Sequence, residues 1–223
     1  MKKLCVLIMV LSLMLLAACG GKEPIQNPDP SASTEMQAAQ TQTEAEAIDE
    51  EQNVSEDDFR TASLGDGTCE IVACSSTAEV IQVPETLFGE TVVGIGSNAF
   101  AMLEAQKIIL PDTVEYLDEY AFSMCDNLVE VNLGKGLKKI GYMSFNLCNE
   151  LLSISFPEGM EEMVDVCFGA CKKLGEVYIP ESVTKFGNRI ASTSLCPEIV
   201  IVTPAGSAAE ANAQEYGIPY RNP

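Results

Sequence analysis

A unit of 23 residues recurs through residues 92–182, and this repeat constrains the fold more than any other feature of the chain. Three copies begin at Val114, Leu137 and Met160, each 23 positions after the last, while a first copy from Val92 is one residue shorter. Apolar residues occupy the same positions in every copy. A period of about 20 to 29 residues with a spaced apolar set is typical of a leucine-rich solenoid, in which stacked neighbours bury the apolar face that no unit can bury alone.

Each copy holds a short run in which inward and outward residues alternate, namely residues 107–110, 130–133, 153–156 and 176–179. Alternation with a period of two indicates β-strands, with the second and fourth residues in the core. Every run is followed by a proline or glycine that ends the strand: Pro111, Gly134, Pro157 and Pro180. We therefore expect an α/β-type repeat protein, a short leucine-rich repeat solenoid with one strand per coil and a parallel sheet on the concave face.

A small residue followed by phenylalanine marks the return path of every coil, at residues 99–100, 121–122, 144–145 and 167–168. The simplest interpretation is a buried column of phenylalanine rings beside a column too crowded for a large side chain.

The two ends of the array need caps, because a solenoid must cover the faces of its terminal coils. Gly65, Asp66 and Gly67 predict the turn of an N-terminal β-hairpin. Ser207 with Glu210 three residues later predicts a C-terminal helix that ends at Gly217. The expected leucine-rich repeat domain spans 59–223, with an N-cap over 59–91, four repeats over 92–182, and a degenerate repeat and C-cap over 183–223.

These residues resemble BspA-like leucine-rich repeats, whose units place Ile-Gly, Ala-Phe, Cys, Leu and Ile-x-Ile-Pro at fixed spacings. The resemblance covers Phe59 to Pro223, with departures at Leu103 in place of Cys, Gly134 in place of Pro, and Ile190-Ala191 in place of Ala-Phe. It implies the solenoid fold and, by analogy with a family associated with bacterial adhesion and host contact, a surface-binding role.

Residues 1–18 have the pattern of a targeting segment, with Lys2 and Lys3 before an apolar run over 4–16. The run is shorter than the roughly 20 residues of a membrane-spanning helix. The motif Leu16-Ala17-Ala18-Cys19 resembles the lipobox of bacterial lipoproteins, which implies cleavage before Cys19 and attachment of diacylglycerol and further acyl chains such as palmitate to it. The alternative is a secretory signal in which Cys19 is incidental. We expect a lipid-anchored, extracytoplasmic protein at the cell membrane.

After Cys19, the segment up to residue 58 has almost no large apolar residue and carries eleven acidic residues against Lys22 alone. Such a composition cannot bury enough surface to offset the entropy of ordering it. Residues 19–58 are therefore expected to be a lipidated, disordered acidic tether.

The formal charge of −20, with 13 basic residues that form no cluster, argues against a nucleic-acid partner. A charged partner should instead be basic, and we expect a protein or a glycan.

Nine cysteines suggest either metal binding or redox chemistry. Cys125, Cys148 and Cys171 share one repeat position, and Cys196 joins them, so their thiols should form a stacked column. Zinc needs four ligands that converge, and a parallel column without histidine does not converge. Buried free thiols are the first interpretation, with an inter-coil disulfide and a metal site as alternatives. A disulfide between Cys69 and Cys74 would need a turn between them.

The chain has no histidine, no Gly-x-Ser-x-Gly elbow and no glycine-rich phosphate loop. These absences remove the common nucleophile and base pairs and phosphate-binding loops, although a pair of carboxylates brought together by the fold stays open. We expect no enzymatic activity, no cofactor and no metal.

The outward residues of the strands are then the main candidates for function, because solenoids commonly bind through the exposed sheet. Ile109 and Tyr178 are the most suggestive, since exposed apolar or aromatic side chains suit interface anchors. We expect a protein-binding or glycan-binding module, with an envelope spacer that has no specific ligand as the alternative. The predicted partner-binding residues on the concave face are Lys107, Ile109, Glu130, Asn132, Ser153, Ser155, Glu176 and Tyr178.

Overall fold

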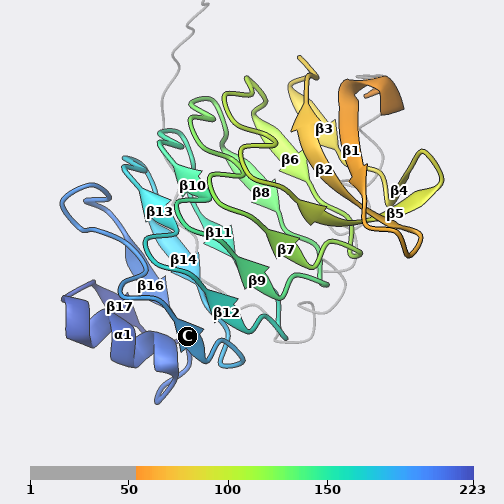
Figure 1. The fold of residues 1–223 in the computed structure, drawn as a ribbon. Helices are drawn as coiled ribbons and strands as arrows, with labels where there is room; N and C mark the ends of the chain where they lie inside the picture. The colour runs from red at the N-terminus through yellow and green to blue at the C-terminus, as the bar shows by residue number, and fades with distance from the viewer. Residues whose placement is uncertain (1–53) are drawn as a thin grey trace, which may run out of the picture. The chain divides into compact units, whose positions relative to one another are not determined.

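The structure is a computed structural model that describes residues 54–223. These residues wind into successive coils of short strands and turns that stack along one axis (Figure 1). Residues 1–53, which include the predicted signal segment, Cys19 and most of the predicted tether, lie outside the described residues. The 3-10 turn η1 (Glu56–Asp58) precedes the expected domain start at Phe59 and is tied to the fold, since Ser75 donates its backbone N–H to the carbonyl of Asp58 at 2.8 Å. The folded unit therefore begins before the sequence pattern does.

The predicted strand in each coil is present, and these strands stack in parallel. They form a three-stranded sheet in the order β3-β6-β8 and a four-stranded sheet in the order β11-β14-β16-β17. The predicted inward residues Ile108, Val131, Ile154 and Val177 are buried. The strands are β3 (Val80–Gln82), β6 (Lys107–Ile109), β8 (Glu130–Asn132), β11 (Ile154–Ser155), β14 (Glu176–Tyr178), β16 (Val200–Val202) and β17 (Tyr220–Arg221).

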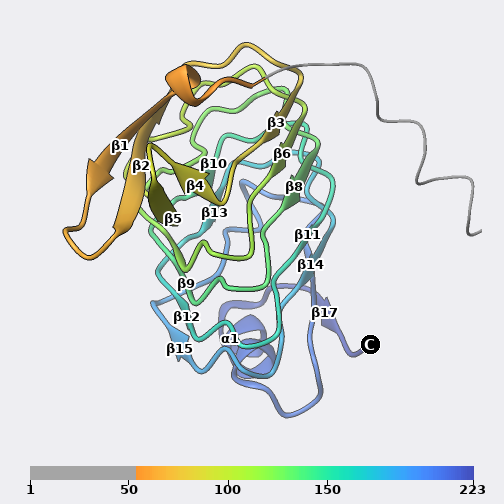
Figure 2. The same cartoon turned by 90° about the vertical axis from the view of Figure 1, so that its right-hand side faces the viewer.

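A second sheet forms the opposite wall of the coil, and the sequence analysis did not predict it (Figure 2). Its order is β1-β2-β5-β7-β9-β12-β15, with β4 (Thr86–Leu87) beside β5. Most of its strands are two residues long, which is too short for alternation to show in the sequence. The strands are β1 (Phe59–Ser63), β2 (Thr68–Cys74), β5 (Glu90–Ile95), β7 (Tyr116–Leu117), β9 (Lys139–Ile140), β12 (Glu162–Met163) and β15 (Lys185–Phe186).

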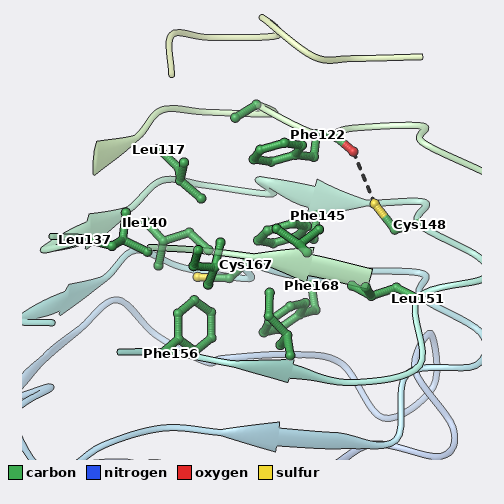
Figure 3. Close-up of a cluster of buried hydrophobic side chains, with 14 of the residues drawn as sticks. Leu117, Phe122, Leu137, Ile140, Phe145, Cys148, Leu151, Phe156, Cys167 and Phe168 are labelled. Atoms are coloured by element: carbon green, nitrogen blue, oxygen red, sulfur yellow. Dashed lines mark hydrogen bonds between the residues drawn. The ribbon is translucent and has the colours of Figure 1, made fainter. Parts of the chain in front are cut away.

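The phenylalanines form a continuous buried column, as predicted (Figure 3). Ring centroids of Phe122 and Phe145 are 5.1 Å apart with an interplanar angle of 3°, and those of Phe145 and Phe168 are 5.8 Å apart. Phe59 of β1 extends the column at its start, 6.3 Å from Phe100. Two of the rings lie on the short parallel strands β10 (Phe145–Asn146) and β13 (Phe168–Gly169). Aromatic contacts thus run from coil to coil through the centre of the fold, from Phe59 to Phe168.

Two residues with left-handed backbone flank each phenylalanine, a regularity that the sequence does not show. In the second coil these are Tyr120 at φ 57° and Met124 at φ 60°. Such a conformation is unfavourable for a non-glycine residue by roughly 1 to 2 kcal/mol. The turns persist because every second backbone N–H donates a hydrogen bond to a carbonyl of the next coil. The N–H of Phe122, for example, donates to the carbonyl of Ser144 at 2.8 Å.

Glycine replaces the expected proline at the end of β8 for a local reason. Gly134 has φ 60°, and a Cβ at this position would collide with the carbonyl oxygen of Pro111 in the previous coil. The departure from the repeat pattern therefore preserves close stacking of the two coils.

Both predicted caps are present. β1 and β2 pair antiparallel across the glycine-containing turn. Helix α1 (Ala208–Tyr216) begins after Ser207, whose side chain accepts the N–H of Glu210, and ends at Gly217 in the left-handed region. The carboxylate of Glu210 accepts the backbone N–H of Gly206 at 2.6 Å. Within residues 54–223, no helix combines the length and apolarity needed to cross a membrane.

Phe145→Ala tests the aromatic column. We expect the free energy of unfolding to fall by about 3 to 5 kcal/mol, because the substitution removes a fully buried ring that stacks on both sides. Chemical denaturation followed by circular dichroism measures the change. Leu152→Ala is the control, since that side chain is 53% exposed and its loss should change stability by less than about 0.5 kcal/mol. Equal midpoints for Phe145→Ala and the parent chain would contradict a structural role for the column.

Candidate binding surface

The outward residues of the predicted strands align into two columns, which together we call the outer face. Val80, Lys107 and Glu130 lie in register across β3, β6 and β8, as do Gln82, Ile109 and Asn132. Further along, Ser155 pairs with Tyr178, and Tyr178 pairs with Val202. The register follows from the repeat length, because equal coils place equal positions above one another.

The outer face is hollowed where two serines stand between larger neighbours. A depression of about 390 Å³ opens over β8, β11, β14 and β16. Ser153 and Ser155 are exposed and short, so they leave room between the side chains on either side. The lining residues are Glu130, Val131, Ser153, Ile154, Ser155, Glu176, Tyr178 and Val202.

Both glutamates of the depression are paired with cations from its two ends. Lys107 Nζ lies 2.9 Å from Oε1 of Glu130. Arg221 of β17 donates through Nε and Nη2 to Oε1 of Glu176, at 3.2 and 2.8 Å. Both glutamate side chains are 58% exposed, so each carboxylate also faces solvent. Exposed pairs of this kind add little to stability, and their effect is on the charge and shape of the surface.

Tyr178 is partly exposed and held in place by its hydroxyl. The O–H donates to Oε1 of Glu158 at 2.9 Å. This hydrogen bond, with some burial and the negative charge of the same carboxylate, raises the pKa of Tyr178 above its ordinary value. The phenol is therefore neutral at physiological pH and its ring is fixed beside the depression.

The structure brings together five of the eight predicted partner-binding residues, while the other three lie outside the lining. Lys107 and Ile109 lie one coil before the depression, on β6. Asn132 lies on β8 in the same column as Ile109 and is not part of the lining. Sequence reasoning missed Val202, which lies in the degenerate final coil, and Arg221, which is 45 residues from the glutamate it contacts. The repeat pattern could have indicated Val202 through its register with Tyr178, but no local signal indicated Arg221.

A second depression of about 390 Å³ lies on the opposite sheet, between β7 and β9. There the Tyr116 hydroxyl donates to Oε2 of Glu70 at 2.8 Å, and the ring covers Gly94, where a Cβ would collide with it. Burial and the neighbouring Glu70 raise the pKa of Tyr116. The lining residues are Glu115, Tyr116, Leu117, Asp118, Lys138 and Lys139.

The stacked cysteines are part of the packing. Cys125, Cys148 and Cys171 each donate a thiol hydrogen bond to the carbonyl of a phenylalanine in the preceding coil, at 3.0, 3.1 and 2.8 Å. Figure 3 shows one of these contacts, from Cys148 to Phe122. All seven cysteines in the described part of the chain are free, and Cys74 alone among them is partly exposed.

The surroundings of these thiols raise their pKa values, so they ionise less readily than an exposed cysteine. Burial raises the pKa of Cys125 to about 11. The thiol of Cys148 raises the pKa of Cys171 to about 12, to which burial also contributes. Within residues 54–223 there is no group of three or more histidine, cysteine or acidic side chains arranged to hold a metal ion. The buried cysteines pack as small apolar residues, and three of them donate a thiol hydrogen bond to a backbone carbonyl.

Comparisons with known proteins agree on one architecture. A family described as BspA type Leucine rich repeat region matches residues 78–201 in six copies, beyond 92–182 at both ends. Three crystal structures of bacterial leucine-rich repeat proteins are similar in fold. No match was found among curated proteins.

The Treponema pallidum leucine-rich repeat protein has a TM-score of 0.61 and 24% identity, over 67% of this chain and 70% of that one. A leucine rich cell surface protein from Faecalibacterium prausnitzii has a TM-score of 0.60 and 24% identity, over 70% of this chain and 40% of that one. A leucine-rich repeat protein from Bacteroides ovatus has a TM-score of 0.54 and 25% identity, over 68% and 41%. The match thus spans less than half the length of the last two proteins.

Thiol reactivity tests the cysteine column. In the chain from Val54 to Pro223 we expect a thiol reagent at pH 8 to modify Cys74 slowly and the six buried thiols only after unfolding. Burial blocks access, and with a pKa of about 11 only about a thousandth of a thiol is ionised at pH 8. The measurement is mass spectrometry of the labelled protein, native and in denaturant. Because burial raises the pKa of Cys74 as well, labelling of this thiol in the native protein should become faster as the pH is raised. Rapid native labelling of Cys125 or Cys171 would contradict the buried column.

Proposed function

The chain belongs to the BspA type leucine-rich repeat family, and we propose that it is a lipid-anchored, extracytoplasmic module that binds a protein or glycan partner through its outer face. Members of this repeat fold are typically binding modules without enzymatic activity, and we extend both properties to this chain.

One observation carries the proposal: the outer face holds a depression that folding does not require. The inward residues of β8, β11 and β14 are buried in the core, whereas Ser153, Ser155 and Glu176 are exposed and lie outside it. A partly exposed tyrosine at the edge of the depression supplies the aromatic contact that anchors many interfaces. Such a surface is suited to recognition and has no evident role in stability.

The location outside the cytoplasm rests on the N-terminal sequence. The lipobox-like motif ending at Cys19 and the acidic segment after it would hold the repeat domain away from the membrane. More than one acyl chain on a residue suffices for stable anchoring, whereas one is marginal. The Faecalibacterium relative is described as a cell surface protein, although at 24% identity that likeness carries the fold alone.

Loss of the outer-face anchors should abolish partner capture. We expect the chain from Val54 to Pro223 carrying both Ile109→Ser and Tyr178→Ser to retain less than a tenth of the partner that the parent retains. Both substitutions remove partly exposed apolar or aromatic surface without entering the core. The measurement is quantitative mass spectrometry of proteins and glycans retained from envelope and host extracts.

The control carries Val93→Ser and Tyr116→Ser on the opposite sheet, where an aliphatic residue and a tyrosine are also partly exposed. Its capture should match the parent chain, and thermal melts should show that each variant is folded. Equal capture by the outer-face variant and the parent would remove the outer face from consideration. No specific capture by the parent would favour the alternative of an envelope spacer.

Replacing the lipidation residue tests the anchor. We expect Cys19→Ser in the full chain to lose the mass of the lipid and to leave the membrane fraction, because serine cannot form the thioether to diacylglycerol. Fractionation with immunoblotting and intact-mass measurement report the change. Cys74→Ser, a cysteine within the repeat domain, is the matched control and should stay with the membrane. Unchanged partitioning of Cys19→Ser would contradict the lipid anchor.

A further inference from the structure

Resting on the binding role proposed above, we infer that the depression of the outer face receives an arginine side chain of a polypeptide partner.

The spacing of the two glutamates suits a single cation between them. Glu130 and Glu176 both line the depression, two coils apart, with Ser153 between them. The coils keep a 23-residue register here, because the N–H of Leu152 donates to the carbonyl of Val129 and that of Gly175 to the carbonyl of Leu152. Adjacent strands are about 4.8 Å apart, so the two glutamate backbones are about 10 Å apart. In the structure the two carboxylates contact Lys107 and Arg221 at opposite ends of the depression, so a partner cation seated above Ser153 would compete with these exposed ion pairs.

The protein itself shows that these carboxylates bind such groups. Arg221 contacts Glu176 through two donors, and Lys107 contacts Glu130. Both contacts involve Oε1, and a carboxylate offers about four acceptor sites over its two oxygens. Since both side chains are more than half exposed, each carboxylate can accept a further donor from a partner.

The remaining lining favours a guanidinium over an ammonium group or a neutral sugar. A guanidinium is planar and carries five donors in a fixed arrangement, enough to reach two carboxylates and the hydroxyl of Ser153 or Ser155 together. The ring of Tyr178, fixed by its hydrogen bond to Glu158, offers a face on which that plane can stack. The formal charge of −20 steers cationic partners toward the molecule and gives no such advantage to a neutral glycan.

Matched peptides test the side chain. The probe is a fluorescent nonapeptide, Gly-Ser-Gly-Arg-Tyr-Arg-Gly-Ser-Gly, with counterparts that carry citrulline or lysine in place of both arginines. Anisotropy titrations use the full chain in about 0.15 M salt, where the charges of distant groups are largely screened. We expect the arginine peptide to bind at least 10-fold more tightly than the citrulline peptide and severalfold more tightly than the lysine peptide. Equal affinities for the arginine and citrulline peptides would overturn the inference.

Three variants locate the contact. Ser153→Leu fills the depression without changing charge, and Glu176→Gln removes one carboxylate; each should weaken binding of the arginine peptide at least 5-fold. Arg221→Gln removes the internal competitor and should strengthen binding severalfold. Glu162→Gln is the matched control, because Glu162 is on the opposite sheet, is also ion-paired, to Lys139 at 3.4 Å, and carries the same charge. Its affinity should stay within 2-fold of the parent chain. Equal losses in Glu176→Gln and Glu162→Gln would overturn the inference in favour of attraction by overall charge.

The two proposals fail in different ways. If the variant with Ile109→Ser and Tyr178→Ser loses capture of its partner while the arginine and citrulline peptides bind equally, the arginine inference is overturned and the binding role stands. If the arginine peptide binds as described and that variant still captures the partner, the depression is supported as an arginine site and the natural partner binds elsewhere.

Discussion

In-register stacking of successive coils is the constraint on which the rest of this structure depends. Most coils are 23 residues long, so each side chain lies above its counterpart and backbone N–H groups of one coil meet carbonyls of the next, as Phe145 meets Cys167 at 3.0 Å. This arrangement lets two-residue strands persist, because the ladder continues through many coils. It also stabilises the left-handed turns around each phenylalanine, which would be unfavourable in an isolated unit.

The same stacking assigns opposite roles to the two kinds of column. Inward columns must exclude water, and there the residue types that suggest chemistry serve packing. The phenylalanine rings contact one another, and the cysteine thiols satisfy backbone carbonyls that the turns would otherwise leave buried and unpaired. Outward columns face solvent and need not exclude water, so small and large residues can alternate along them. The depression over Ser153 and Ser155 is a consequence of that freedom.

Periodicity predicted much of the fold because the same spacing of apolar residues recurs in every copy of the repeat. The strands over 107–110, 130–133, 153–156 and 176–179, the phenylalanine column, the hairpin and the helix that ends at Gly217 all follow local patterns with known causes. The second sheet was not predicted, because strands such as Tyr116–Leu117 are too short to alternate visibly. The turn Glu56–Asp58, which has no apolar pattern, joins the fold through backbone hydrogen bonds.

The sequence by itself determined the period, the inward and outward positions, and hence the family and the candidate face. Those properties depend on spacing along the chain, which can be counted. Only the tertiary structure decided which outward residues form a depression and which charges meet there. Arg221 reaches Glu176 across the sheet because β17 folds back beside β16, and the volume over Ser153 depends on its neighbours in other coils. A cavity and an ion pair between distant segments are properties of three-dimensional proximity, and no single stretch of sequence records them.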